Sequence, residues 1–321
     1  MKDISMKTMR DALIEQIYKK MFDDEMIFFL SADLGSPVLD KVREKFEERF
    51  INVGIAEQNL INVSTGLAFE GYTVYAYALA PFITMRAYEQ LRVNLSISAE
   101  LMDLNVNLIG VGAGLSYDVS GPTHHCIEDI IIMRALPNFI TISPSDCKIA
   151  ESLVDYTIDV KKPKYIRLDA KPLPQIYNKT DNFNLENGFC ELIEGEKICL
   201  VTTGNMTHNA LNASKRLQEN KINVGVLDMI ILKPVREELL FNFLKKYECI
   251  ITIEEGFINK GGLDSLILDI LNKYQLGIRL EKLGFDDKYV FDLGGRNHLH
   301  TMNNLDEESI IKIVKENLNR F

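Results

Sequence analysis

The sequence predicts an α/β fold of two domains, each built on a mostly parallel β-sheet covered by helices. Three observations lead to this prediction. The chain has 321 residues, which is too long for one small core and suits two domains. Short apolar runs alternate with helical patterns in two separate stretches. Between them, residues 171–188 are rich in Pro, Asn and Asp, which predicts a linker joining domains at 1–170 and 189–321.

The first stretch supplies strand and helix patterns in regular alternation. The apolar run "EMIFFLSAD" predicts a strand, because it is short and ends in turn residues. The run "SPSD" predicts a helix start, with Pro144 and Asp146 near the first turn. The predicted strands and helices of this stretch are strands at 25–33, 72–78, 104–112, 139–143 and 164–169, and helices at 57–71, 82–97, 127–136 and 147–159.

The second stretch repeats the alternation. We expect strands at 197–204, 222–228, 248–255 and 277–284, helices between them and a last helix at about 305–319. In open α/β sheets of this kind, ligands bind at the carboxyl ends of the strands. Residues that directly follow strands are therefore the first candidates for a functional site.

The composition argues against nucleic-acid and membrane partners and favours a cytoplasmic location. Hydrophobic residues make up 46% of the chain and charged residues 26%, as in soluble globular proteins. The net charge of -10 argues against nucleic acid and acidic membranes, because phosphate contacts require a basic surface. No run reaches the roughly 18 apolar residues that a membrane helix requires. The five cysteines are odd in number and form no CxxC pair, which predicts a reduced, cytoplasmic protein.

The first candidate for chemistry is Glu57 in "VGIAEQNL". It follows the strand pattern "RFINVG", with Gly54 in the turn, and begins a helix of mostly small or apolar residues. A helix start favours the ionised carboxylate, whereas apolar surroundings favour the neutral acid. A carboxyl group held between these effects can exchange a proton near neutral pH. The alternative is a solvated glutamate that caps the helix, and the pattern taken alone favours that alternative.

The second candidate is the loop at 113–125, which ends in "SGPTHH". The adjacent His124 and His125 can act as acid, base or hydrogen-bond donor. Zinc is disfavoured, because neighbouring side chains point apart and no Cys or His cluster accompanies them, so we expect no metal ligands in this chain. The alternative is that both histidines only shape the turn. Elsewhere, "EEGFINKGG" lacks the phosphate-loop pattern, and we expect Gly261 and Gly262 to allow a tight turn.

Several stretches taken together resemble one known family. "GIAEQN" with "GLAFEGY", "PFITMRAYEQLR" and "GPTHHCIEDIIIMRALPN" resemble the pyrimidine-binding domain of a transketolase, and "SADLGS" and "TISPSD" fit the same pattern. "EEGFINKGGLDS" resembles the C-terminal domain of that family. Full-length members also carry a diphosphate-binding domain with a GDG motif, which this chain lacks. The chain is therefore similar to the C-terminal subunit of a split transketolase.

The resemblance implies an activity, a cofactor and partners. It implies transfer of a two-carbon ketol unit from a ketose, or its phosphate, to an aldose. The implied cofactor is thiamine diphosphate, with Mg²⁺ or Ca²⁺ held mainly by a separate N-terminal subunit that carries the GDG motif. The cofactor would bind where the two chains meet. The implied assembly is a homodimer core of this chain flanked by its partner, a heterotetramer.

The resemblance also assigns roles to single residues. Glu57 matches the glutamate that hydrogen-bonds a ring nitrogen of the cofactor's aminopyrimidine, and Phe82 matches a residue that packs against that ring. His124 matches the catalytic histidine near the substrate oxygens. Arg10 and Ser36 match positions that help hold a substrate phosphate.

Four positions depart from the family pattern. Ser120 stands where a substrate-contacting aspartate is usual, although Asp118 is two residues away. The other departures are Gly112 at a histidine position, Ala170 at a phosphate-binding arginine and Leu79 at an aromatic near the cofactor. Because an arginine–phosphate contact is strong and geometrically specific, these changes predict an unusual sugar substrate.

Three alternatives remain open. A beta subunit of a 2-oxoacid dehydrogenase shares the fold and the "GIAEQ" glutamate, but "GPTHHCIEDI" matches transketolase more closely. An enzyme like deoxyxylulose-phosphate synthase would use pyruvate as donor, and the "IEDIIIMR" helix fits transketolase better. A non-catalytic interaction subunit is the third alternative, and the retained Glu57 and Phe82 count against it.

Overall fold

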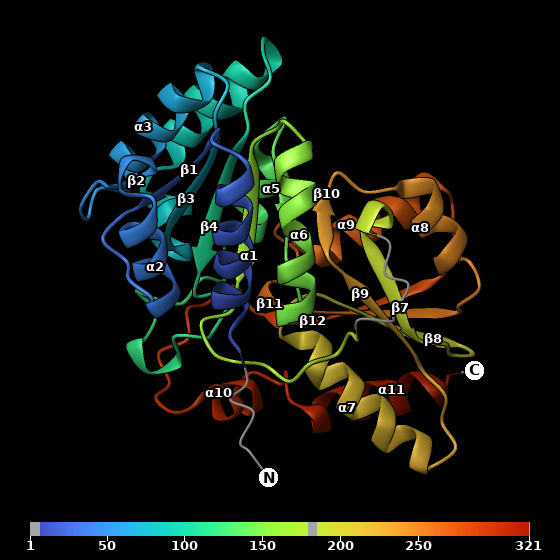
Figure 1. Ribbon diagram of the computed structural model, residues 1–321. Helices are drawn as coiled ribbons and strands as arrows, with labels where there is room; N and C mark the ends of the chain where they lie inside the picture. Colours follow the sequence, from blue (N-terminus) through green and yellow to red (C-terminus); the bar gives the residue numbers. More distant parts are fainter. Residues whose placement is uncertain (1–6, 179–184, 321) are drawn as a thin grey trace. The chain divides into compact units, whose positions relative to one another are not determined.

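The computed structural model describes residues 7–178 and 185–320 (Figure 1). Within these residues the chain forms two compact units, one from residues 7–113 with 132–178 and the other from 114–131 with 185–320. Each unit has its own mostly parallel sheet with helices packed on it, so the predicted α/β fold in two parts is confirmed.

The sheet of the first unit is parallel, with the strand order β5-β6-β4-β3-β1-β2. Its strands are β1 Ile27–Ser31, β2 Phe50–Asn52, β3 Thr73–Leu79, β4 Val106–Val111, β5 Ile140–Ile142 and β6 Lys164–Leu168. Every residue of β4 is buried, as are all residues of β3 except the last. Strands buried on both faces are expected where helices cover both sides of a parallel sheet.

The helices of this unit are α1 Met9–Asp23, α2 Pro37–Lys45, α3 Glu57–Phe69, α4 Tyr88–Gln90, α6 Cys147–Asp159 and the part of α5 (Asp129–Ala135) from residue 132 onward. Figure 1 shows α1 and α6 side by side, and residues of these two helices are in contact. Asp146 accepts hydrogen bonds from the first backbone amides of α6, which confirms the predicted helix start.

The helix predicted at 82–97 is present but irregular. Phe82–Arg86 and Leu91–Ile97 form π-helical turns on either side of α4. Such wide turns are rare and often occur at functional sites, because they redirect side chains out of the regular spiral.

The second unit has a mixed sheet with the order β12-β11-β8-β9-β7. The strands of this sheet are β7 Phe189–Ile193, β8 Ile198–Thr202, β9 Gly225–Met229, β11 Cys249–Phe257 and β12 Arg279–Phe285. The short strand β10, Ile231–Lys233, follows β9 in the chain and is not part of this sheet. The edge strand β7 pairs antiparallel with β9, and the other neighbours are parallel.

The helices of the second unit are α7 Met206–Glu219, α8 Glu237–Leu244, α9 Leu263–Lys273, α10 Arg296–Met302 and α11 Glu307–Leu318. Figure 1 shows α7 with α11 on one face of the sheet and α8 with α9 on the other. Two separate apolar clusters correspond to these two faces. The unit therefore buries both sides of its sheet, as the alternating pattern predicts.

Residues 114–131 lie between strands of the first unit in sequence but pack with the second unit. Leu115 and Ile127 belong to the apolar cluster under α7 and α11. Ile130 belongs to the cluster under α8 and α9. The segment that contains "SGPTHH" is therefore built onto the core of the C-terminal unit.

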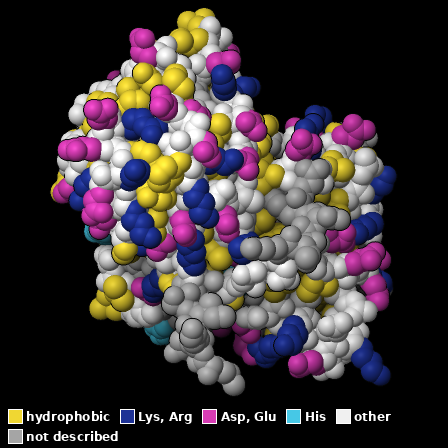
Figure 2. Space-filling model, in the orientation of Figure 1, with side chains coloured by type: hydrophobic (Ala, Val, Ile, Leu, Met, Phe, Trp, Pro, Cys, Tyr) yellow, Lys and Arg dark blue, Asp and Glu magenta, His cyan; other side chains and the backbone are white. Residues whose placement is uncertain are grey.

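Two further observations concern the surface. No helix in the described part of the chain is long and apolar enough to cross a membrane. On the face shown in Figure 2, basic and acidic side chains are interspersed. That face carries no extended basic region of the kind that binds phosphate backbones.

Candidate active site

Glu57 is the first residue of α3 and follows β2 through a short turn. Gly54 in that turn has a φ of +75°, which glycine adopts at low cost. The side chain of Glu57 is only 3% exposed. The alternative of a solvated glutamate is therefore wrong, and the carboxylate lies inside the unit at a strand's carboxyl end.

Glu57 is bonded to an arginine that the sequence interpretation missed. Arg86 Nη1 donates to Glu57 Oε2 at 2.6 Å, and the arginine side chain is 47% exposed. The same guanidinium lies 4.4 Å from the ring centroid of Phe82. Carboxylate, cation and aromatic ring thus form one cluster, and a cation over an aromatic face is attractive. The spacing of Phe82 and Arg86 within one helical turn was the signal that could have revealed this cluster.

The two residues expected to hold a substrate phosphate already have bonds within the first unit. Arg10 Nε donates to Asp11 Oδ1 at 2.9 Å. Ser36 is largely buried and caps α2, where its Oγ accepts a hydrogen bond from the Leu39 amide. The cap consumes one acceptor position of the Ser36 hydroxyl, and its proton is still available to a ligand oxygen.

His124 and Ser120 lie on the 114–131 segment of the second unit. Ser120 is exposed, and His124 is half-buried with its Nδ1 3.0 Å from Thr123 Oγ1. His125 is buried, and this burial lowers its pKa against the opposing effects of the Asp118 backbone and of the Glu255 carboxylate. Between the two histidines, His124 is the one that a ligand can reach.

Asp118 does not take over the role of the aspartate that is missing at Ser120. Its side chain is 3% exposed, and its Oδ2 accepts a hydrogen bond from the Arg296 amide at 2.7 Å. Its Oδ1 accepts from the Val119 amide. A carboxylate with both oxygens bonded to backbone amides shapes the loop and is not offered to a substrate.

The glycine turn in "EEGFINKGG" is confirmed. Gly261 has a φ of +103°, and a Cβ placed on Gly262 would lie 2.6 Å from the Glu254 carboxylate oxygens. These glycines therefore permit a tight backbone path next to Glu254. Across the described residues, no group of three or more His, Cys, Asp or Glu side chains is arranged to hold a metal ion.

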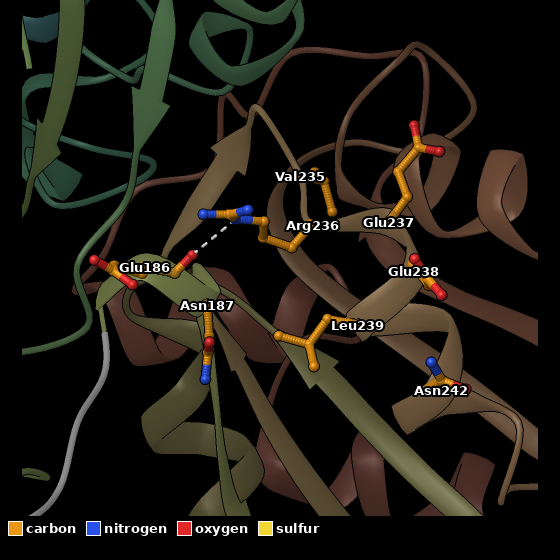
Figure 3. Close-up of a pocket in the computed structure, with 8 residues that line it drawn as sticks. All are labelled: Glu186, Asn187, Val235, Arg236, Glu237, Glu238, Leu239 and Asn242. Atoms are coloured by element: carbon orange, nitrogen blue, oxygen red, sulfur yellow. Dashed lines mark hydrogen bonds between the residues drawn. The ribbon is translucent and has the colours of Figure 1, made fainter.

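A separate hollow of about 740 Å³ lies in the second unit (Figure 3). Its walls come from the N-terminal part of α8 and from Glu186 and Asn187. Arg236 Nε donates to the Glu186 carbonyl across it. None of the predicted site residues lines this hollow, so we do not assign it to the reaction.

Comparison with known proteins identifies two family models. The model for the pyrimidine-binding domain of transketolase matches residues 5–175, and the model for the transketolase C-terminal domain matches residues 191–293.

Two curated relatives and one solved structure are similar over most of this chain. A subunit of the apulose-4-phosphate transketolase of Actinobacillus succinogenes is 34% identical over 272 residues, which is 84% of this chain and 85% of that protein. A 1-deoxy-D-xylulose-5-phosphate synthase of Clostridium perfringens is 31% identical over 298 residues, which is 90% of this chain but 45% of that protein. A structure described as a split gene transketolase, inactive beta4 tetramer, superimposes with a TM-score of 0.85 at 30% identity, over 96% of this chain and 97% of that chain.

Proposed function

This chain belongs to the transketolase family, and we propose that it works as the C-terminal subunit of a split transketolase that moves a two-carbon ketol unit from a ketose to an aldose. One observation carries the proposal. In the domain matched by the pyrimidine-binding model, a buried carboxylate stands beside an aromatic ring and a cation.

The Glu57 cluster fits the pyrimidine end of thiamine diphosphate. An aminopyrimidine needs one partner for a ring nitrogen and an apolar surface for its face. Glu57 offers a buried carboxylate, and Phe82 offers a half-buried ring. Because Arg86 is bonded to Oε2, we assign Oε1 of Glu57 to the ring nitrogen. A carboxylate in this place can hold a proton and return it.

Thiamine diphosphate, when bound, supplies the electron sink of the reaction, and the protein supplies position and proton control. In this chain Glu57 exchanges the proton at its carboxylate, and Phe82 packs against the cofactor ring. His124 donates a hydrogen bond or a proton to a substrate oxygen. Arg10 and Ser36 bind the substrate's phosphate, and Ser120 contacts the sugar.

The partner subunit completes the enzyme. We propose domains at 1–170 and 189–321 with the linker 171–188, and a cytoplasmic location for this chain. A separate N-terminal chain with a GDG motif would hold the diphosphate and Mg²⁺ or Ca²⁺. A homodimer of this chain would form the core of a heterotetramer. The structural neighbour is described as an inactive tetramer of beta chains, which supports both self-association and the need for a partner.

The substrate is proposed to be an unusual sugar. The relative from Actinobacillus succinogenes is named for apulose 4-phosphate, and it is similar over most of this chain. The departures at Ser120 and Ala170 change the residues that would contact the sugar and its terminal phosphate. We therefore propose apulose 4-phosphate, or a ketose of similar kind, as a better substrate than the common pentose phosphates.

The experiment is to combine this chain with its GDG partner, add thiamine diphosphate and Mg²⁺, and measure ketol transfer from each sugar. We expect Glu57→Gln to lower turnover by about 100-fold or more, because it removes the proton-exchanging group. The matched control is Glu70→Gln at the exposed far end of α3, which should leave turnover unchanged. Full turnover by Glu57→Gln would remove this residue from the mechanism, and full activity on ordinary pentose phosphates would refute the altered substrate.

A further inference from the structure

We propose that Glu255 and Arg296 are positioning residues, which hold the loop 114–126 and thereby place His124 for the sugar substrate. The substrate part of this inference rests on the proposed function. The hold itself is a property of this chain, since all the contacts lie within the second unit.

Glu255 of β11 lies directly against the start of the loop. Gly114 has a φ of +55°, and a Cβ on this residue would overlap the Glu255 carboxylate. The Leu115 amide points to Glu255 Oε2 at 3.4 Å. Only glycine therefore lets the loop begin along the surface of this carboxylate.

Arg296, the first residue of α10, binds both the carboxylate and the loop. Its Nε donates to Glu255 Oε1 at 2.8 Å and its Nη2 to Oε2 at 2.5 Å, which is a two-pronged contact. Its backbone amide donates to Asp118 Oδ2 at 2.7 Å. One residue thus fixes the loop at Asp118 while Glu255 fixes it at Leu115, and a planar guanidinium makes this geometry specific.

The far side of the carboxylate is also filled. His300 Nε2 lies 2.5 Å from Glu255 Oε1, and Asn209 of α7 lies 3.2 Å from His300 Nδ1. Glu255, Arg296 and His300 are all buried. Partners on α10 and α7 thus hold the Glu255 carboxylate independently of the loop, so the carboxylate can serve as a fixed point for it.

The loop is closed at its other end by its own backbone. Gly114 and Cys126 exchange two backbone hydrogen bonds of 2.9 Å each. His124 lies two residues before that closure, and its amide bonds to the Gly121 carbonyl. Glu255 and Arg296 therefore act on His124 by fixing the loop on which it lies, which is why we call them positioning residues.

The test uses the full chain, alone and with its partner. Arg296→Lys keeps the positive charge but loses the bidentate contact with Glu255. Asp118→Ala removes the acceptor of the Arg296 and Val119 amides and leaves the Glu255 contacts with Arg296 and His300 in place. The control is Lys246→Met, which breaks the partly exposed ion pair between Lys246 and Glu191 in the same unit and should change stability little.

Hydrogen–deuterium exchange of peptides covering 114–126 measures, in the isolated chain, how firmly Glu255 and Arg296 fix the loop. We expect both variants to exchange at least tenfold faster there, with the control unchanged. In the assembled enzyme we expect KM for the sugar to rise at least tenfold, while the affinity for thiamine diphosphate stays within twofold.

The outcomes separate the two proposals. An assembled wild-type enzyme that transfers no ketol unit would refute the proposed function. The exchange experiment would still determine whether Glu255 and Arg296 fix the loop 114–126. Unchanged exchange in both variants, or a KM that moves equally in the control, would overturn the positioning role. If Arg296→Lys does not fold, Asp118→Ala gives the decision, because it leaves the Glu255 cluster intact.

Discussion

Each unit of this molecule contains a buried glutamate bonded to an arginine. The two pairs differ in the exposure of the arginine and in the number of partners that the glutamate has. Glu57 accepts a hydrogen bond from Arg86, whose side chain is 47% exposed. Glu255 binds the two-pronged Arg296, which is 8% exposed, and also His300. One carboxylate has a partner that can move into solvent, whereas the other is enclosed.

This difference shows that burial alone does not make a carboxylate reactive. Burial by itself would raise the pKa of Glu255, but Arg296 and His300 outweigh it and hold the pKa well below the usual range. Glu255 is thus fixed as an anion and acts as structure. Glu57 has a half-exposed partner and lies at the carboxyl end of a strand, so its carboxylate can serve a ligand.

The largest expected effect is on stability at Glu255. Glu255→Gln leaves the Arg296 guanidinium buried without a counter-charge, so we expect the free energy of unfolding to fall by about 3–5 kcal/mol. Urea denaturation followed by circular dichroism measures this. In contrast, Glu57→Gln should cost below about 1 kcal/mol, because Arg86 can turn into water.

A matched pair in the same unit provides the control. Glu191 is partly exposed and bonded to Lys246 at 2.7 Å, so Glu191→Gln should also cost below about 1 kcal/mol. Equal losses at Glu255 and Glu57 would break the distinction between a structural and an available carboxylate.

Lys164 extends the comparison to a buried cation. Its Nζ donates to Asn105 Oδ1 at 2.8 Å and to the Lys162 carbonyl at 2.9 Å, which are neutral partners. Burial holds the pKa of Lys164 well below its ordinary value. The folded state therefore resists protonation of an amine that the unfolded chain protonates below a pH of about 10.4.

Stability should consequently rise as the pH increases from the folded pKa of Lys164 to about 10.4, by up to roughly 1.4 kcal/mol per pH unit. Lys164→Met should flatten this slope, because the titrating group is gone. Unfolding free energies measured from pH 7 upward test this, with the exposed Lys162→Met as control. An identical slope in both variants would exclude Lys164 as its source.

The fold was predicted well because the spacing of apolar residues and the position of turn residues determine its strands and helices. The strands and helices expected at 57–71, 104–112 and 147–159 are present within a few residues. The edge strand β7 and the helix α10 were not predicted. The pattern "RNHLHTM" has no apolar stripe, and α10 is held by Arg296 and His300 bonding to Glu255, which are contacts far apart in sequence.

The candidate site was predicted only in part, for the same reason. Local pattern located Glu57 at a strand's end, and the resemblance pointed to Phe82 and His124. Arg86 and the hold on loop 114–126 were not foreseen, because they depend on which side chains meet. The packing of that loop with the C-terminal unit is a property of three-dimensional contacts and leaves no signal in spacing.

The smallest expected effect is at Arg86, the half-exposed partner of Glu57. Arg86→Met removes the cation beside Glu57 and Phe82, but a half-exposed ion pair contributes about 1 kcal/mol or less to stability. We therefore expect an unchanged denaturation midpoint together with a roughly threefold to tenfold weaker affinity for thiamine diphosphate in the assembled enzyme, which corresponds to about 1 kcal/mol. Isothermal titration of the cofactor measures the affinity. A variant that loses stability but binds cofactor normally would place Arg86 with Arg296 among the structural partners, and the distinction between an available and a structural glutamate would then fail.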